Sequence, residues 1–247
     1  MVSRVAAILS AFTPETPALG VSELARRCGL AKSTVSRIVA ELIEHGFLER
    51  KGTDLILGLR VFELGELAAR PRDLRRLAMA VMADLRQATG QTVHMAVLED
   101  AEVVYIAIMH SRTSPRMPSR VGGRMPAFAT GVGKALLAFA PMSAVDRVIE
   151  KGLWKVGPRT ITDGDVLRDE LLRIRASGLA IEREESGEGI SCAAAPIIGA
   201  DGTVVAAISI SGFSDYLNVS QVGPAVQTAV LGLNRLLKTR PAALPHL

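Results

Sequence analysis

Two helical patterns with a glycine between them, followed by two short strand-like runs, constrain the fold of this chain most. The first pattern opens at Val21 and ends at Gly29, and the second runs from Lys32 to Gly46. Glycine tolerates the left-handed backbone that stops a helix, so a tight turn is expected at Gly29. Residues 47–50 and 51–57 then read as a short hairpin. This order of elements is typical of a winged helix-turn-helix.

The second helix of this motif has one apolar side and one polar end. The apolar side recurs at helical spacing and consists of Val35, Ile38, Val39, Leu42 and Ile43. The polar start of the helix supplies the candidate DNA-binding residues Lys32, Ser33, Thr34, Ser36 and Arg37. Such side chains contact phosphates and base edges. The sequence therefore favours a double-stranded DNA operator as partner. The alternative is a helical hairpin that packs against its own protein and leaves these residues solvated.

Composition places the chain among globular proteins that work in a reducing compartment. Hydrophobic residues make up 49% and charged residues 22% of 247, and the two cysteines have no CxxC spacing. Residues 1–76 hold 12 lysines and arginines against 9 acids, a basic excess that suits a polyanion. The first dozen residues resemble a weak signal peptide, but Val5, Ile8, Leu9 and Phe12 favour an amphipathic helix. No apolar run approaches the roughly 18 residues of a membrane span, so we expect a cytoplasmic protein without membrane contact.

The rest of the chain predicts an α+β domain. Residues 59–70 read as a helix broken by Pro71, and a long amphipathic helix follows from about Leu74 to Gly90, so the domain boundary lies near 70–76. Strands are expected at 91–100, 101–110, 179–184, 190–198 and 203–211. Helices are expected at 131–140, 143–151, 163–176 and 220–238. Consecutive hairpins flanked by helices predict an antiparallel sheet.

Three stretches of this sequence resemble the IclR family of bacterial transcription regulators. They are VSELARRCGLAKSTVSRIVAELIEHGFLER (21–50), PAFATGVGKALLA (126–138) and EREESGEGISCAAAPIIGADGTVVAAISISG (182–212). The resemblance implies a winged helix-turn-helix DNA-binding domain at 1–60, a linker helix at 61–75 and a GAF-like effector-binding domain at 76–247. It also implies a homodimer or homotetramer that controls nearby catabolic genes. The chain departs from the family pattern at Glu182, where aspartate is usual, and in its short wing, which lacks an aromatic residue near Leu57.

Cys192 raises the question of whether the second domain is an enzyme. A catalytic cysteine needs a base, and only His94 and His110 could approach it. Neither a nucleophile elbow nor a Gly-x-Ser-x-Gly run is present, which disfavours an enzyme. An enzyme with Cys192 as its nucleophile is therefore only the alternative function. A buried structural cysteine is a third possibility. Ser209 and Ser211 lie two residues apart and so share a strand face, which Cys192 can join from the neighbouring strand. A polar face inside an apolar sheet is costly unless a bound polar ligand satisfies it, and this favours a pocket wall.

The expected effector site combines these residues with the start of a helix. Residues from Thr130 to Gly133 begin that helix, whose free N–H groups and dipole attract a carboxylate. Together with the family resemblance, this gives the candidate effector-binding residues Thr130, Gly131, Val132, Glu182, Cys192, Ser209 and Ser211. The floor candidates are Met95, Val97, Val103 and Tyr105, most of which also suit a plain core. Lys134 is interpreted as a solvated or helix-packing residue. No residues have metal-ligand spacing, and neither metal nor cofactor is expected.

The loop from Ser111 to Phe128 carries four arginines, interleaved with Met117 and Met125: Arg112, Arg116, Arg120 and Arg124. One interpretation is a solvated loop, or one that pairs with Glu182, Glu184 and Glu185. The other is a lid in which arginine clamps the carboxylate of a small organic acid and methionine adapts to its apolar body. For the oligomer, we expect the linker face of Val61, Phe62, Leu64 and Leu67 to supply part of the interface.

Overall fold

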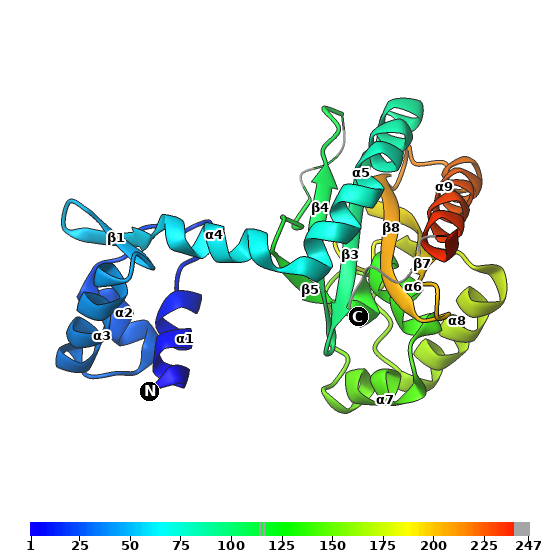
Figure 1. The fold of residues 1–247 in the computed structure, drawn as a ribbon. Helices are drawn as coiled ribbons and strands as arrows, with labels where there is room; N and C mark the ends of the chain where they lie inside the picture. Colours follow the sequence, from blue (N-terminus) through cyan, green and yellow to red (C-terminus); the bar gives the residue numbers. More distant parts are fainter. Residues whose placement is uncertain (114, 116, 240–247) are drawn as a thin grey trace. The chain divides into compact units, whose positions relative to one another are not determined.

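A computed structural model of the chain describes residues 1–113, 115 and 117–239. The chain divides into two compact units, Met1–Arg72 and Asp73–Leu247. Figure 1 shows both units coloured along the sequence. Each unit has its own hydrophobic core.

The first unit is built from helices and a two-stranded wing. Its helices are α1 (Val2–Ser10), α2 (Val21–Cys28), α3 (Lys32–Glu44) and α4 (Leu59–Leu67), and its strands are β1 (Leu48–Lys51) and β2 (Asp54–Leu57). Gly29 ends α2 in the left-handed conformation, with φ of 63°, which explains the need for glycine at the turn. Leu19 forms a backbone bridge with Leu55 and joins the segment before α2 to the wing. The predicted winged helix-turn-helix is confirmed.

The core of this unit comes from the predicted apolar face of α3. Val35, Ile38, Val39 and Leu42 are buried against Ile8, Leu24, Leu48 and Leu55. Burying such side chains contributes roughly 1.5–3 kcal/mol each. Since this face holds α3 in the core, the polar start of the helix is left on the surface.

The region expected to be a linker helix at 61–75 divides into two helices. α4 ends at Leu67, and α5 (Ala69–Thr89) begins before Pro71 rather than after it. The expectation that Pro71 breaks a helix was therefore wrong. Proline in the first turn of a helix removes an N–H that has no helical acceptor, so it can start a helix as readily as it ends one.

The second unit is an α+β domain around one antiparallel sheet. Its strands are β3 (Thr92–Glu99), β4 (Glu102–Met109), β5 (Arg124–Pro126), β6 (Ala180–Arg183), β7 (Ile190–Ile198) and β8 (Val204–Phe213). They lie in the order β5-β4-β3-β8-β7-β6. The remaining elements are η1 (Ala127–Ala129), α6 (Gly131–Phe139), α7 (Met142–Glu150), α8 (Gly164–Ser177) and α9 (Val219–Thr239). The predicted hairpins are confirmed, whereas the short edge strand β5 was not expected.

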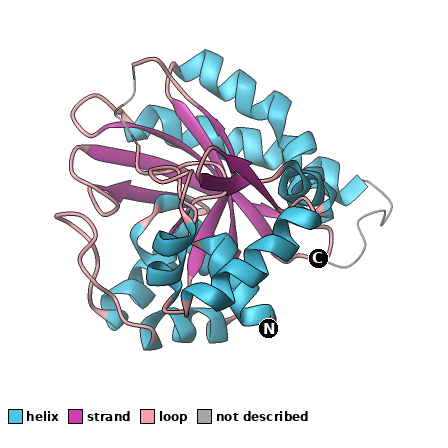
Figure 2. Cartoon of the chain, turned by 90° about the vertical axis from the view of Figure 1, so that its left-hand side faces the viewer, coloured by secondary structure: helices cyan, strands magenta, loops and turns pink. Residues whose placement is uncertain are grey.

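Helices cover both faces of this sheet (Figure 2). On one face α5 and α9 pack against apolar side chains such as Met95 and Ile208. On the other face α6, α7 and α8 form a second core, with Phe128 fully buried. Cys192 pairs with Ser211, and Ser209 with His94, so the sheet register places these polar residues on the α6 side. Within the described residues no helix is both long and apolar enough to cross a membrane.

Candidate functional site

The candidate DNA-binding residues lie at the exposed start of α3. Lys32, Ser33, Ser36 and Arg37 are exposed and Thr34 is half-buried, while Val35 between them is fully buried. Neither Lys32 nor Arg37 forms an ion pair with any described residue. The positive charges are therefore free to bind phosphates or base edges. The alternative of a helix end that is merely solvated predicts the same exposure.

The seven candidate effector-binding residues meet around one pocket in the second unit. Thr130, Gly131 and Val132 come from the start of α6, Glu182 from β6, Cys192 from β7, and Ser209 and Ser211 from β8; all seven line the pocket. The cavity measures about 30 Å³, which is room for about one or two water molecules. Met117, Pro118 and Ser119, which are half-buried or exposed, form its outer side.

Gly131 and Cys192 are in direct contact at the start of α6. A Cβ atom added at Gly131 would overlap the sulfur of Cys192, which explains why a glycine is required here. Thr130 caps the helix, with its Oγ1 accepting a hydrogen bond from the Gly133 N–H at 3.1 Å. Burial raises the pKa of the Cys192 thiol well above its usual value, and the nearby Glu182 carboxylate raises it further. The thiol is thus kept neutral, which is unfavourable for a nucleophile.

Glu182 is the one acidic side chain among the pocket-lining residues that the structure describes. Its side chain is 1% exposed. Its Oε1 accepts hydrogen bonds from the N–H groups of Glu185 at 2.6 Å and Ser186 at 3.0 Å, and from the Ser186 hydroxyl at 3.3 Å. Burial raises the pKa of Glu182 to about 6, although the two backbone hydrogen bonds oppose this shift.

His94 also lines the pocket, where sequence reasoning considered it only as a possible base. Its Nε2 lies 2.8 Å from the Ser119 hydroxyl and its Nδ1 lies 3.3 Å from the Ser211 hydroxyl. Burial lowers the pKa of His94 to about 3, so the ring is neutral and bridges the floor and the outer side of the pocket. Ser119, Ser186 and Ile190 were also missed. The pairing of His94 with Ser209 could have identified His94, because paired residues share a sheet face.

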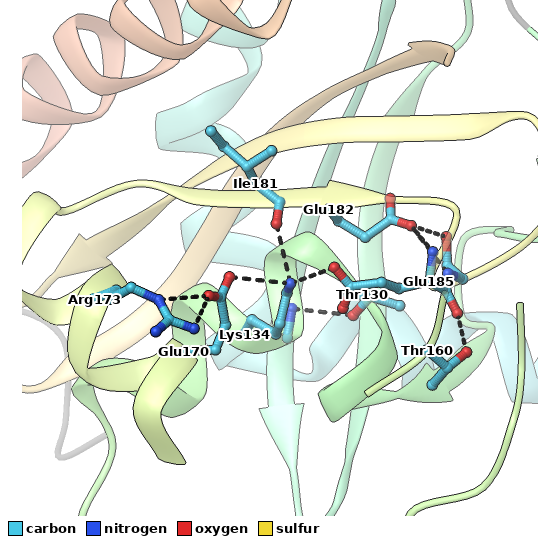
Figure 3. A network of polar contacts seen from close by, with 10 residues as sticks. Thr130, Lys134, Thr160, Glu170, Arg173, Ile181, Glu182 and Glu185 are labelled. Atoms are coloured by element: carbon cyan, nitrogen blue, oxygen red, sulfur yellow. Dashed lines mark hydrogen bonds and ion pairs between the residues drawn. The ribbon is translucent and has the colours of Figure 1, made fainter. Parts of the chain in front are cut away.

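Lys134 is fully buried, which contradicts the interpretation of a solvated residue and agrees with that of a helix-packing one. Its Nζ donates to Glu185 Oε1 at 2.6 Å and to the carbonyl of Ile181 at 3.0 Å, and it lies 3.5 Å from Glu170. Figure 3 shows this network, in which Lys134 of α6 reaches β6, the loop after it and α8. The ammonium group therefore holds in place the loop whose N–H groups bind Glu182.

The sequence matches two domains of one protein family, at positions that correspond to these sites. Residues 1–52 match the IclR helix-turn-helix domain, and residues 67–232 match the family described as bacterial transcriptional regulator IclR C-terminal. The chain belongs to the IclR family.

Individual IclR-family proteins are similar over most of their length. HTH-type transcriptional regulator KdgR of Escherichia coli is 35% identical over 213 residues, which cover 85% of this chain and 81% of KdgR. HTH-type transcriptional regulator XynR of the same organism is 28% identical over 242 residues, 96% of both chains. The crystal structure of an IclR homolog from Microbacterium hydrocarbonoxydans, complexed with 4-hydroxybenzoate, matches with a TM-score of 0.89 at 30% identity, covering 97% of this chain and 99% of that chain.

These similarities confirm the predicted family, fold class and general function. This IclR-family protein is a transcriptional regulator with a helix-turn-helix DNA-binding domain and a C-terminal effector-binding domain. It is not an enzyme, so the alternative in which Cys192 acts as a nucleophile is set aside. Within the described residues no cluster of histidine, cysteine, aspartate and glutamate could hold a metal ion.

The arginines of this loop that the structure describes are exposed, which agrees with the interpretation of a solvated loop and not with that of a carboxylate clamp. Arg124 is exposed and pairs with Glu102 at 3.2 Å, and neither it nor Arg112 or Arg120 lines the pocket. Arg116 lies outside the described residues. The expected acidic partners of the loop bind other cations, since Glu185 pairs with Lys134 and Glu184 with Arg159. Met117 and Met125 do line the pocket, so only the methionines of the expected lid contribute to it.

Among the floor candidates only Tyr105 lines the pocket. Met95 and Val97 point into the core on the opposite face of the sheet, against α5 and α9. Val103 belongs to the core beneath α6. The alternation of side chains along a strand shows which residues share a face, but it does not identify the face that lines the pocket.

Proposed function

We propose that this IclR-family protein is an oligomeric regulator whose operator binding changes when a small organic acid occupies the pocket lined by Cys192. The observation that supports this most is the convergence of all seven candidate residues, from four separate elements, on one buried polar pocket. The hydroxyl, thiol and carboxyl groups that line this pocket can each form hydrogen bonds to a polar ligand. Its setting is the bacterial cytoplasm, where operator DNA is accessible.

The effector class follows from the groups around the pocket. The hydroxyls of Ser209 and Ser211 and the N-terminal end of α6 favour an oxygen-rich, electron-rich head group. Tyr105, Met117, Met125 and Ile190 favour an apolar body. The homolog from M. hydrocarbonoxydans, complexed with 4-hydroxybenzoate, supports an aromatic acid as the first compound to test. Such an acid exceeds the 30 Å³ cavity, so the pocket must widen to admit it, and the loop that carries Ser119 is the part we expect to move.

Operator recognition is proposed for the exposed start of α3. A gel-shift titration with the DNA upstream of the gene and its neighbours should show a specific complex that weakens as salt rises. Arg37→Ala should weaken binding by about 1–3 kcal/mol if Arg37 binds a guanine, whereas Arg147→Ala, which removes an exposed charge from the second unit, should not. An affinity unchanged by Arg37→Ala at several salt concentrations would reject the assignment.

The effector proposal is tested separately by thermal shift. 4-Hydroxybenzoate should raise the melting temperature of the second unit, because a ligand stabilises the state that binds it. The neutral amide of the same compound should raise it less. Equal shifts for acid and amide would reject a carboxylate site, and loss of the shift in Ser211→Ala would support the assigned pocket.

A further inference from the structure

The buried network around Lys134 holds more carboxylates than its lysine can neutralise. Glu182 and Glu185 are both buried, and Lys134 pairs with Glu185 at 2.6 Å. Glu170, at 3.5 Å from Lys134, has a cation of its own in Arg173 at 3.0 Å (Figure 3). Among the described residues no lysine or arginine lies within ion-pair distance of Glu182. The one carboxylate that lines the pocket is therefore the one without a cation.

The hydrogen bonds of Glu182 leave one of its oxygens unused by the loop. All three donors from Glu185 and Ser186 bind Oε1. The remaining oxygen, Oε2, receives none of them, although the thiol of Cys192 is a hydrogen-bonding neighbour of the carboxyl group. A proton added to Glu182 therefore belongs on Oε2, where it leaves the hydrogen bonds from the loop intact.

The surroundings of Glu182 contain little that could offset its negative charge. From its own loop it faces Glu185, from α6 Lys134, from β7 Cys192, and from β4 Tyr105. Burial raises the pKa of Cys192 and Tyr105 and lowers that of His94, so these three groups are neutral near pH 7. An organic anion entering this pocket brings a second negative charge close to Glu182. Two like charges in a buried site favour retention of a proton by one of them.

We propose that Glu182 controls the binding of organic acids in this pocket through its protonation, and that it takes up one proton from solvent when the anion binds. The carboxyl O–H of Glu182 then donates to the anion, and the net charge of the pocket wall changes by one on binding. This inference rests on the proposed function of the pocket as an organic-acid site. It adds that the affinity depends on pH through one named side chain.

The direction of the pH dependence follows from the burial of Glu182. Burial raises its pKa from the usual 4.5 to about 6, so the protonated form is the minor one at neutral pH. Since only that form accepts the anion, the dissociation constant should rise about tenfold for each pH unit above the pKa. Proton uptake should grow from about half a proton near pH 6 towards one proton near pH 8.

Calorimetric titration of 4-hydroxybenzoate into the full-length protein measures this directly. Between about pH 6 and about pH 8, two buffers with different ionisation enthalpies give the number of protons taken up. Glu182→Gln should abolish the uptake and the pH slope, and should bind the acid at pH 8 up to about a hundredfold more tightly than the wild type. The control Glu188→Gln, which removes an exposed acid of the same loop, should keep both.

A ligand-free measurement tests the titration of Glu182 itself. A carboxyl group whose folded pKa is raised stabilises the fold fully below its unfolded pKa and loses that contribution as pH rises through its folded pKa. The melting temperature of the wild type, relative to that of Glu182→Gln, should therefore decrease as the pH rises from about 4.5 to above about 6. If the glutamine variant does not fold, the number of protons taken up by the wild type can still be obtained from the dependence of its binding enthalpy on the buffer.

The two proposals fail in different ways. Binding of the acid without proton uptake, together with weaker binding by Glu182→Gln, would mean that Glu182 stays ionised and accepts a hydrogen bond from the ligand. That result would overturn this inference and leave the organic-acid pocket standing. Absence of binding at every pH, in the wild type and in Glu182→Gln alike, would overturn both.

Discussion

At the scale of single residues, the contact between Gly131 and Cys192 sets the shape of the pocket. The helix start can approach the β7 sulfur only because Gly131 has no side chain. The Gly131 N–H also donates a hydrogen bond to the Cys192 sulfur, which opposes the rise in the thiol pKa that burial causes. The absence of a side chain at Gly131 thus decides how closely α6 approaches the sheet.

We expect Gly131→Ala to destabilise the second unit by about 1–3 kcal/mol, because its Cβ overlaps the Cys192 sulfur. Adding Cys192→Ala should recover much of this loss, because the overlapping atom is removed. The control Gly232→Ala, in α9 with no atom within 4 Å of the added Cβ, should be neutral or stabilising by up to about 1 kcal/mol. Denaturant unfolding followed by the fluorescence of Trp154, the one tryptophan, measures all three. Equal losses in the single and double variants would exclude the contact as the cause.

At the scale of elements, Lys134 ties α6 to three other parts of its unit. A buried lysine is costly to desolvate, and here a carboxylate, a backbone carbonyl and a second acid compensate it. Thr160 adds a further link, because its hydroxyl donates to the Glu185 carbonyl at 2.6 Å. The loop that positions Glu182 is therefore held by hydrogen bonds to both a side chain and a backbone carbonyl of Glu185.

Lys134→Met should destabilise the second unit by about 3–5 kcal/mol, because it leaves Glu185 buried without a cation. Combining it with Glu185→Gln should cost less than the single change, since no unpaired charge then remains. Lys155→Met, at an exposed lysine, should lie within about 0.5 kcal/mol of the wild type. Chemical denaturation gives these values; a loss no larger for Lys134 than for Lys155 would contradict the role of the network.

At the scale of the whole molecule, the pocket and the core beneath α5 lie on opposite faces of strand β3. His94 faces the pocket, while its neighbour Met95 packs on the opposite face in the core that includes Leu74, Ala78 and Met82 of α5. α5 continues towards α4, which has no buried residue. We expect a shift of β3 on effector binding to move α5, with couplings between two such sites typically worth about 1–3 kcal/mol.

The exposed apolar side chains of α4 lead us to expect a dimer. Phe62 is 64% exposed and Leu67 is 68% exposed, which is unusual for large apolar residues gathered on one helix. Light scattering at micromolar concentration should give a multiple of 26.2 kDa. Phe62→Glu combined with Leu67→Glu should shift the protein towards the monomer and weaken operator binding, because two half-sites are no longer bound together. Val166→Glu, an exposed apolar residue of α8, serves as control; a monomer in the wild type would contradict the expectation.

The elements of this fold could be predicted because their signals are local. The helical spacing of Val35, Ile38 and Leu42 and the glycine at position 29 are properties of neighbouring residues, and each was confirmed. Pro71 was misjudged because proline fits the first turn of a helix as well as the position after its end. The strand β5 was missed because three residues at a sheet edge carry no periodic pattern.

Local sequence patterns identified part of the pocket lining, whereas the charges and partners of its residues follow from the fold. The alternation of side chains along β8 and the glycines before Lys134 are local sequence patterns. Ser209, Ser211 and Gly131 could therefore be identified as pocket residues. The sequence did not predict that Lys134 is buried, or that it pairs with Glu185, 51 positions away. It also did not predict that His94 is neutral. Ionisation depends on desolvation and on charges brought together from distant parts of the chain, and no local pattern contains those distances.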